Sequence, residues 1–181
     1  MLVGGREYTV GVLVQANYGE RATLRIAGVP VGREIPDLLP ELAAEERPDA
    51  APLGNDGSIL VVVTTDAPVS QPTLKAMARR AALGLARNGA TANPTSGDVV
   101  IAFATTSIEP DAEPPHLVHQ AVLFPYAAKP LYAGVIGATE EAVVNALVAA
   151  RSMTGRHGGH VHALPHDRLR EVLDQYNRLE A

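Results

Sequence analysis

The stretch "GNDGSILVVVTTDAP", residues 54–68, decides the fold of this chain. Its apolar, β-forming run from Ile59 to Val63 predicts a strand that enters a hydrophobic core. The strand follows an Asn-Asp-Gly turn and opens with Ser58, directly after Gly57. A hydroxyl at the start of a buried strand, directly after glycine, the residue with the greatest backbone freedom, needs an explanation.

The composition of the chain bounds the class of protein. With 181 residues and 46% hydrophobic side chains, the chain can bury one core. Its net charge of −5, without a basic patch, argues against a nucleic-acid partner. The absence of cysteine excludes disulfides, thiolate nucleophiles and cysteine-based metal sites.

The N-terminal stretch "MLVGGREYTVGVLVQANYG" lacks the pattern of a secretory signal, and we find no segment with the length of a membrane span. We therefore expect no membrane partner and a cytoplasmic location. Residues 10–14 read as a strand already in progress, as in the middle of a domain.

The hydrophobic periodicity and the turn residues outline the other elements. We expect strands over residues 8–16, 23–26, 58–64 and 99–104. We expect one helix from an N-cap at Ser70 to about residue 88, with Gly89 after its end, a second from a cap at Thr139 to about residue 153, and a third beginning near Pro165 and His166. Residues 36–57, rich in proline and acidic side chains, are predicted to be a mobile, exposed linker, and residues 107–116 a second exposed loop. This order of elements favours a layered α+β domain.

Ser58 admits two interpretations. Serine is common where a strand begins after a turn. Alternatively, cleavage of the Gly57–Ser58 bond would make Ser58 a chain terminus, whose own α-amine, with a pKa near ~8, can serve as the base that activates the hydroxyl. Gly57 would leave the bond open to attack, and the acidic linker would let the new ends separate.

Three further polar residues are candidate partners of Ser58. Ser96 and Asp98, in "NPTSGDVV", precede a strand that could lie beside the Ser58 strand, so that they could relay a proton or orient the nucleophile. Asn17, after the first strand, could donate to an oxyanion. Each also fits an ordinary turn.

The histidines suggest a metal site only weakly. His157, His160, His162 and His166 lie close together, but "HGGHVH" matches no metal-binding motif. The sequence also has no glycine-rich nucleotide motif. We therefore expect no metal and no cofactor.

Six segments together carry a resemblance to a known family. They are "YTVGVLVQANYG", "LRIAGVPVG", "DGSILVVVTTDAP", "LKAMARRAALGLARNGA", "SGDVVIAF" and "HALPHDRLREVL". With them the chain resembles the C-terminal half of the P1 family peptidases, the group of L-aminopeptidase/D-esterase and β-peptidyl aminopeptidase enzymes. The resemblance covers nearly the whole chain.

The resemblance implies an αββα sandwich similar to N-terminal nucleophile hydrolases, self-cleavage at Gly57–Ser58, and Ser58 as the nucleophile. The family's second serine and its acidic partner lie 38 and 40 residues after the nucleophile, at Ser96 and Asp98 here. Asn17 matches the family asparagine at the oxyanion hole. The resemblance also implies a metal-free homotetramer. Because the family has a long portion before "YTVG", we expect residues 1–181 to be the C-terminal portion of one peptidase domain, incomplete at its N-terminus.

The sequence thus predicts a self-processing serine aminopeptidase or amidase. It would release N-terminal residues from small peptides, amides or esters with a free amino end, through an acyl-enzyme on Ser58. Two other functions stay open. One is an acyltransferase of the ornithine acetyltransferase type, whose nucleophile is threonine. The other is an inactive fragment that needs a missing N-terminal half.

Overall fold

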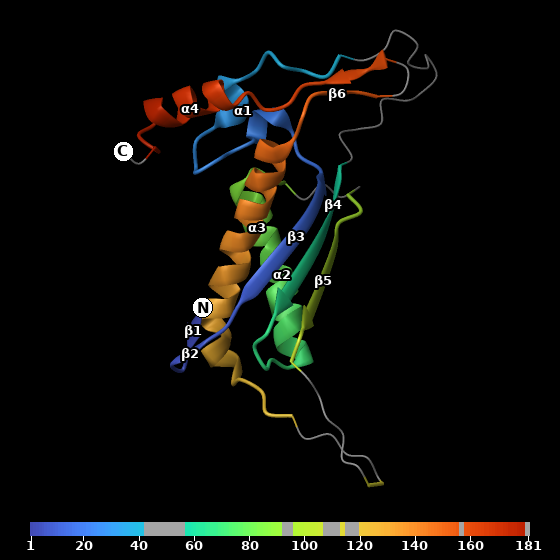
Figure 1. Cartoon of the computed structure of the whole chain (residues 1–181), viewed down its shortest axis with the longest axis vertical. Coiled ribbons are helices and arrows are strands. Elements are labelled where there is room, and N and C mark those ends of the chain that lie inside the picture. Colours follow the sequence, from blue (N-terminus) through green and yellow to red (C-terminus); the bar gives the residue numbers. More distant parts are fainter. Residues whose placement is uncertain (42–56, 92–95, 107–112, 115–119, 156–157, 180–181) are drawn as a thin grey trace.

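A computed structural model describes residues 1–41, 57–91, 96–106, 113–114, 120–155 and 158–179 (Figure 1). Most of the predicted linker over residues 36–57 therefore lies outside the described residues, as does most of the loop over residues 107–116. The elements, in chain order, are β1 (Leu2–Val3), β2 (Arg6–Glu7), β3 (Val10–Asn17), the 3-10 helix η1 (Arg21–Thr23), α1 (Val31–Glu34), β4 (Ser58–Thr65), α2 (Gln71–Arg87), β5 (Val99–Ala104), the 3-10 helix η2 (Pro125–Ala128), α3 (Lys129–Ala149), β6 (Met153–Thr154), β7 (His160–Val161) and α4 (His166–Gln175).

The central sheet has three strands in the order β3-β4-β5. β3 runs antiparallel to β4, with Asn17 opposite Ser58 and Val10 opposite Thr65. β4 runs parallel to β5, with Leu60 opposite Val99. Because α2 connects β4 to β5, the two strands start at the same end of the sheet, as the sequence predicted (Figure 1).

One face of the sheet forms the main hydrophobic core. Along β4, side chains alternate between the two faces, and Ile59, Val61 and Val63 are buried against α2 and α3. The two helices pack closely, because a β-carbon on Gly84 of α2 would lie 2.6 Å from the Ile136 carbonyl oxygen of α3. The predicted α+β class is confirmed, as one sheet layer and one helix layer.

The opposite face of the sheet is apolar and exposed. It consists of the side chains that alternate with the core residues, including Leu13, Leu60, Val99, Ile101 and Phe103, each between 45% and 70% exposed. A contiguous apolar face of this kind is typical of a surface that another part of an assembly covers. Ser58 belongs to this face, at its edge.

The sequence predicted α2 well. Ser70 is its N-cap and Pro72 lies in the first turn. Gly89 follows the C-cap Asn88 with a φ of +98°, a conformation that favours glycine.

Two element predictions were wrong. Thr139 does not cap a helix: α3 begins ten residues earlier, at Lys129, and ends at Ala149. Thr139 lies in its middle, fully buried, and donates its hydroxyl to the Val135 carbonyl. The strand expected over residues 23–26 is absent from the described chain, because η1 takes up Arg21–Thr23 and Ile26 forms only an isolated bridge with Val29.

The α3 region also corrects the expectation about membrane-length segments. Residues Pro125–Ala149 form a helix that is long and apolar enough to cross a membrane by length and composition alone. In this fold, Leu131, Val135, Thr139 and Val143 of α3 are buried in the core. These residues pack against α2 and β3, whereas the other side chains of α3 are partly or fully exposed in this chain.

A second, smaller hydrophobic cluster joins α1 to α4, and α4 is the helix that was predicted to begin near Pro165 and His166. Val31 and Ile35 pack with Leu169 and Val172. Arg168 donates two hydrogen bonds to Asp37, at 2.7 and 2.8 Å.

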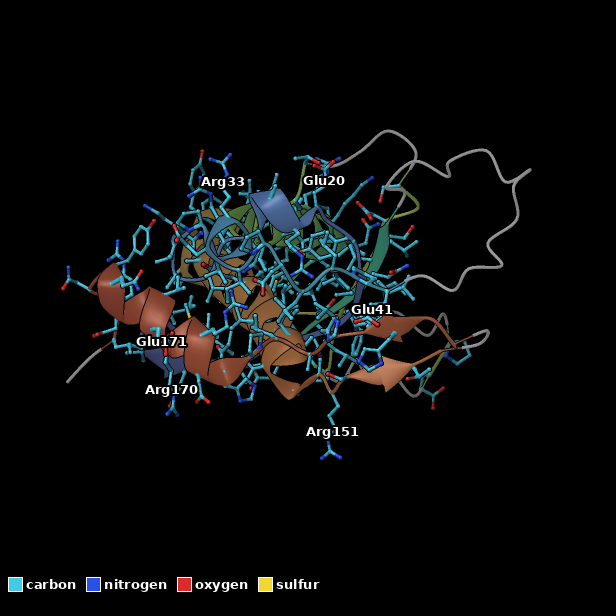
Figure 2. All side chains as sticks on the ribbon, turned by 90° about the horizontal axis from the view of Figure 1, so that it is seen from above. Glu20, Arg33, Glu41, Arg151, Arg170 and Glu171 are labelled. Carbon is cyan, nitrogen blue, oxygen red and sulfur yellow. The ribbon has the colours of Figure 1, made fainter. Side chains whose placement is uncertain are left out.

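Seen from above, Glu41 lies beside the β6–β7 hairpin, where it pairs with His160 (Figure 2).

Replacing Leu131 with alanine tests the helix layer. Leu131 is fully buried, so its truncation leaves a cavity, and we expect the free energy of unfolding to fall by about 2–5 kcal/mol. Urea denaturation measures the change. Leu83→Ala, at an exposed position of the same layer, is the control and should change stability by no more than about 0.5 kcal/mol. Equal effects of the two variants would contradict the packing.

Candidate active site

Because β4 and β5 are parallel neighbours, they start at the same end of the sheet, which brings Ser58 close to the segment before β5. The backbone N–H of Gly97 donates a hydrogen bond to Ser58 Oγ at 3.1 Å. The hydroxyl of Ser58 is therefore held from the β5 side, although the two residues are far apart in the sequence. Ser58 is half-buried at this position.

Ser96 and Asp98 lie against the Gly57–Ser58 bond. Ser96 Oγ is 2.7 Å from the carbonyl oxygen of Gly57 and 2.6 Å from Asp98 Oδ1. Since a hydroxyl carries one proton, Ser96 can donate to one of these two acceptors at a time. Asp98 Oδ1 also accepts the backbone N–H of Ile59 at 3.1 Å, which fixes the start of β4.

Gly57 occupies a place where no side chain fits. A β-carbon there would lie 2.4 Å from Tyr18 Cα and 2.5 Å from the Asn17 carbonyl oxygen. Both neighbours are backbone atoms, so a larger residue would displace the end of β3. The glycine keeps the Gly57 carbonyl within reach of Ser96.

Asn17 lies directly opposite Ser58 across the β3–β4 pair. Side chains of directly opposed residues project from the same face of a sheet, about 4.5–5.5 Å apart at their β-carbons. Asn17 is exposed, and its side chain forms no hydrogen bond within the described part of the chain. Its amide is therefore available above the serine, on the apolar face of the sheet.

Tyr18 is a site residue that the sequence analysis missed. It lines a cavity together with Gly57, Ser96 and Asp98. Burial raises the pKa of Tyr18 to about 12, and the negative charge of Asp98 acts in the same direction. Tyr18 is thus a neutral hydroxyl at any physiological pH. Its place in "ANYG" reads as an ordinary turn, and only its close approach to Gly57 indicates a role.

The ionisation of Tyr18 gives a pH-dependent prediction. A phenol titrates at 10.0 in the unfolded chain but near 12 in the fold, so the folded state binds this proton more tightly. The stabilisation is complete below pH 10 and should be lost as the pH rises from about 10 to 12. Phenolate absorbance of the wild type minus that of Tyr18→Phe measures the titration. A midpoint near 10 would contradict the burial of this ring beside Asp98.

A second, larger cavity of about 410 Å³ lies on the other side of the Tyr18–Glu20 segment. Mostly apolar side chains line it, among them Leu38, Val143, Leu147 and Leu164. Neither Ser58 nor Ser96 nor Asp98 reaches it. This cavity is therefore separate from the candidate site around Ser58.

The histidines are distributed over separate contacts. The His160 and His162 rings meet edge to face at 4.8 Å, His162 lies 3.1 Å from Glu41, and His166 contacts the Val148 carbonyl. His157 lies outside the described residues. Among those that are described, no three His, Asp or Glu side chains gather in a way that could hold a metal ion.

The sequence of this chain is similar to those of known peptidases. The model of the peptidase family S58 matches residues 1–161. The chain is 45% identical, over 94% of its length and 43% of the relative's, to the β-peptidyl aminopeptidase BapA of Sphingosinicella xenopeptidilytica.

Two solved structures have the same fold over this chain. One is the L-aminopeptidase D-Ala-esterase/amidase of Ochrobactrum anthropi, described as a prototype of the serine aminopeptidases and a new variant of the Ntn hydrolase fold. It has a TM-score of 0.81 and 38% identity over 99% of this chain and 47% of the other. The other is the PH0078 protein of Pyrococcus horikoshii, with a TM-score of 0.83 and 35% identity over 99% and 46% of the two chains.

The chain thus spans slightly less than half the length of the relatives that it matches. Within that length, the family model extends from the first residue through β7 and includes the whole strand edge with Ser58, Ser96 and Asp98. The chain belongs to peptidase family S58.

Proposed function

We propose that this polypeptide is a self-processing serine aminopeptidase, in which cleavage at Gly57–Ser58 frees Ser58 as the nucleophile. One observation carries the proposal: the carbonyl of Gly57 accepts the Ser96 hydroxyl at 2.7 Å, while Gly97 N–H holds the adjacent Ser58 Oγ at 3.1 Å. The bond to be cut and the attacking oxygen are thus both positioned by the segment before β5.

Self-cleavage proceeds in two steps. Ser58 Oγ attacks the Gly57 carbonyl carbon, the C–N bond breaks, and the proton of the hydroxyl passes to the departing Ser58 nitrogen. An ester then joins Gly57 to Ser58 Oγ. Ser96 donates to the Gly57 oxygen as negative charge develops on it, which is where a fixed donor lowers a barrier most. Water hydrolyses the ester and leaves a carboxylate on Gly57 and a free amine on Ser58.

The freed Ser58 then acts on substrate. Its α-amine, with a pKa near ~8, takes the proton of its own hydroxyl as Oγ attacks the acyl carbon. The Asn17 amide, opposite Ser58, donates to the oxyanion. The amine or alcohol leaves, and water releases the acyl group.

The proposed substrates are small peptides, amides or esters with a free amino end. The names of the relatives, a β-peptidyl aminopeptidase and an L-aminopeptidase D-Ala-esterase/amidase, support this class.

The exposed apolar face of the sheet supports a second candidate, in which this chain is active only when a partner covers that face. Ser58 and Asn17 lie at the edge of the face, so a covering element would also close the site. In this case the chain alone stays uncut.

The intact mass of the purified chain under denaturing conditions tests the two candidates. Two masses that divide the sequence at Gly57/Ser58 support self-processing by this chain. A single uncut mass, in protein shown to be folded by circular dichroism, would contradict it and favour the partner-dependent form.

A further inference from the structure

A cavity of about 170 Å³ opens on the scissile residue from the core side of the sheet. Gly57, Ser96 and Asp98 line one side of it, and Ala82 and Ala86 of α2 also contribute to its lining. Ile59 belongs to the lining as well, and it lies on the core face of β4. The Ser58 side chain, one residue earlier, lies on the opposite, apolar face.

The size and lining of the cavity suit water. At about 30 Å³ for each molecule, the cavity has room for several. Buried waters need polar partners, and the lining supplies hydroxyls from Ser96, Thr91 and Tyr18 and a carboxylate from Asp98. Tyr18 remains a neutral donor there. A water beside Ser96 and Asp98 would also lie next to Gly57.

The cavity communicates with solvent, whereas the other face of the sheet is apolar. Several lining residues are exposed, among them Glu20, Ala82, Ala86 and Thr91. On the opposite face, the residues beyond Ser58 are Leu60 and Val62, flanked by Val99 and Ile101. Both faces meet solvent in this chain, but the hydroxyls and the carboxylate that can hold a water beside Gly57 line the cavity on the α2 side.

We propose that this cavity supplies the water that hydrolyses the ester between Gly57 and Ser58 Oγ. The inference rests on the proposed self-processing and adds the route of its second reactant. The water oxygen bonds to the Gly57 carbonyl carbon, and the bond from that carbon to Ser58 Oγ breaks. Asp98, hydrogen-bonded to Ser96, accepts one proton from the water, and the α-ammonium of Ser58 gives a proton to Ser58 Oγ as it leaves, so that Gly57 ends as a carboxylate. Asp98 and Ser96 thus orient and deprotonate the water in this step.

Filling the cavity from α2 tests the route. Ala86→Phe places an aromatic ring in the cavity while leaving Ser58, Ser96 and Asp98 unchanged. Leu83→Phe, on the same helix but outside the lining, is the matched control. Freshly purified chain is incubated, and samples are stopped in denaturant with hydroxylamine, which converts the ester into a Gly57 hydroxamate that mass spectrometry distinguishes from the carboxylic acid.

We expect Ala86→Phe to form the Gly57 carboxylate at least about tenfold more slowly than the wild type and Leu83→Phe. Hydroxylamine should still release the Gly57 hydroxamate from Ala86→Phe, because the acyl shift precedes the entry of water. Thermal melts verify that both variants fold. If Ala86→Phe does not fold, Ala86→Leu and Ala82→Leu replace it.

Three outcomes would overturn the route. Wild-type cleavage rates in the folded, filled variants would show that water enters elsewhere. Slow cleavage without a trappable ester would assign the cavity to the acyl shift. If the wild-type chain is not cut at all, the proposed function fails and the route fails with it. The first two outcomes leave the proposed function intact, so the two failures are distinguishable.

Discussion

Replacing Ser58 with alanine is expected to leave the chain as a single uncut mass and to abolish any aminopeptidase or esterase turnover. The variant loses the oxygen that attacks Gly57. The nearby hydroxyl of Ser96 cannot replace it, because Ser96 Oγ donates a hydrogen bond to the carbonyl oxygen of Gly57 and is not placed to attack the carbonyl carbon. Intact mass and release of amine from an aminoacyl amide measure the two losses.

The control for Ser58 is Ser70→Ala, which removes a hydroxyl at the N-cap of α2, beyond the other end of β4. It should be cut as fast as the wild type. Cleavage retained in Ser58→Ala would contradict the assignment of the nucleophile. Loss of cleavage in both variants would indicate a folding defect, which circular dichroism detects.

Replacing Ser96 with alanine should slow self-cleavage by about 10²–10³-fold, the usual effect of removing one donor to a developing oxyanion. The variant keeps Ser58, and Gly97 N–H can still hold its hydroxyl. The time course of the two cleavage masses measures the rate. Asp98→Asn should also slow cleavage, because the amide oxygen can still accept from Ser96 and Ile59 but is a weaker acceptor than the carboxylate and cannot take up a proton.

Ser152→Ala serves as the control for Ser96. Ser152 accepts the backbone N–H of Ala163, away from the strand edge, and its loss should not change the rate of cleavage. A Ser96→Ala chain cut at the wild-type rate would remove the carbonyl contact from the mechanism and leave Ser96 with a structural role only.

Local sequence signals predicted those strands and helices in which the apolar residues of the sequence pattern are the ones that are buried in the fold. In β4 and α2 the apolar pattern, caps and turn residues all agree with the fold. For α3 the local signal misled, because "ATEE" has the form of an N-cap followed by an acidic first turn. Contact with α2 buries Thr139 and continues the helix through it, a tertiary effect that local patterns do not contain.

The candidate site was predictable to the extent that it follows from strand order. Parallel β4 and β5 bring Ser58 to the segment of Ser96 and Asp98, and a single helical crossover in the sequence suggests that pairing. Tyr18 and the cavity beside Gly57 were not predictable. They depend on how closely the end of β3 approaches Gly57, which is set by packing between residues some forty positions apart.

Pairing between β3 and β4 would hold the two pieces of a cut molecule together. Eight residue pairs join β3 to β4 across the Gly57–Ser58 bond, and Val12 and Val14 of β3 pack against the core that β4 enters. After a cut the two pieces would stay together as a noncovalent complex, and unfolding would release two chains instead of one. Refolding then becomes a bimolecular reaction, so the melting temperature of cut protein should rise with protein concentration, whereas that of Ser58→Ala should not.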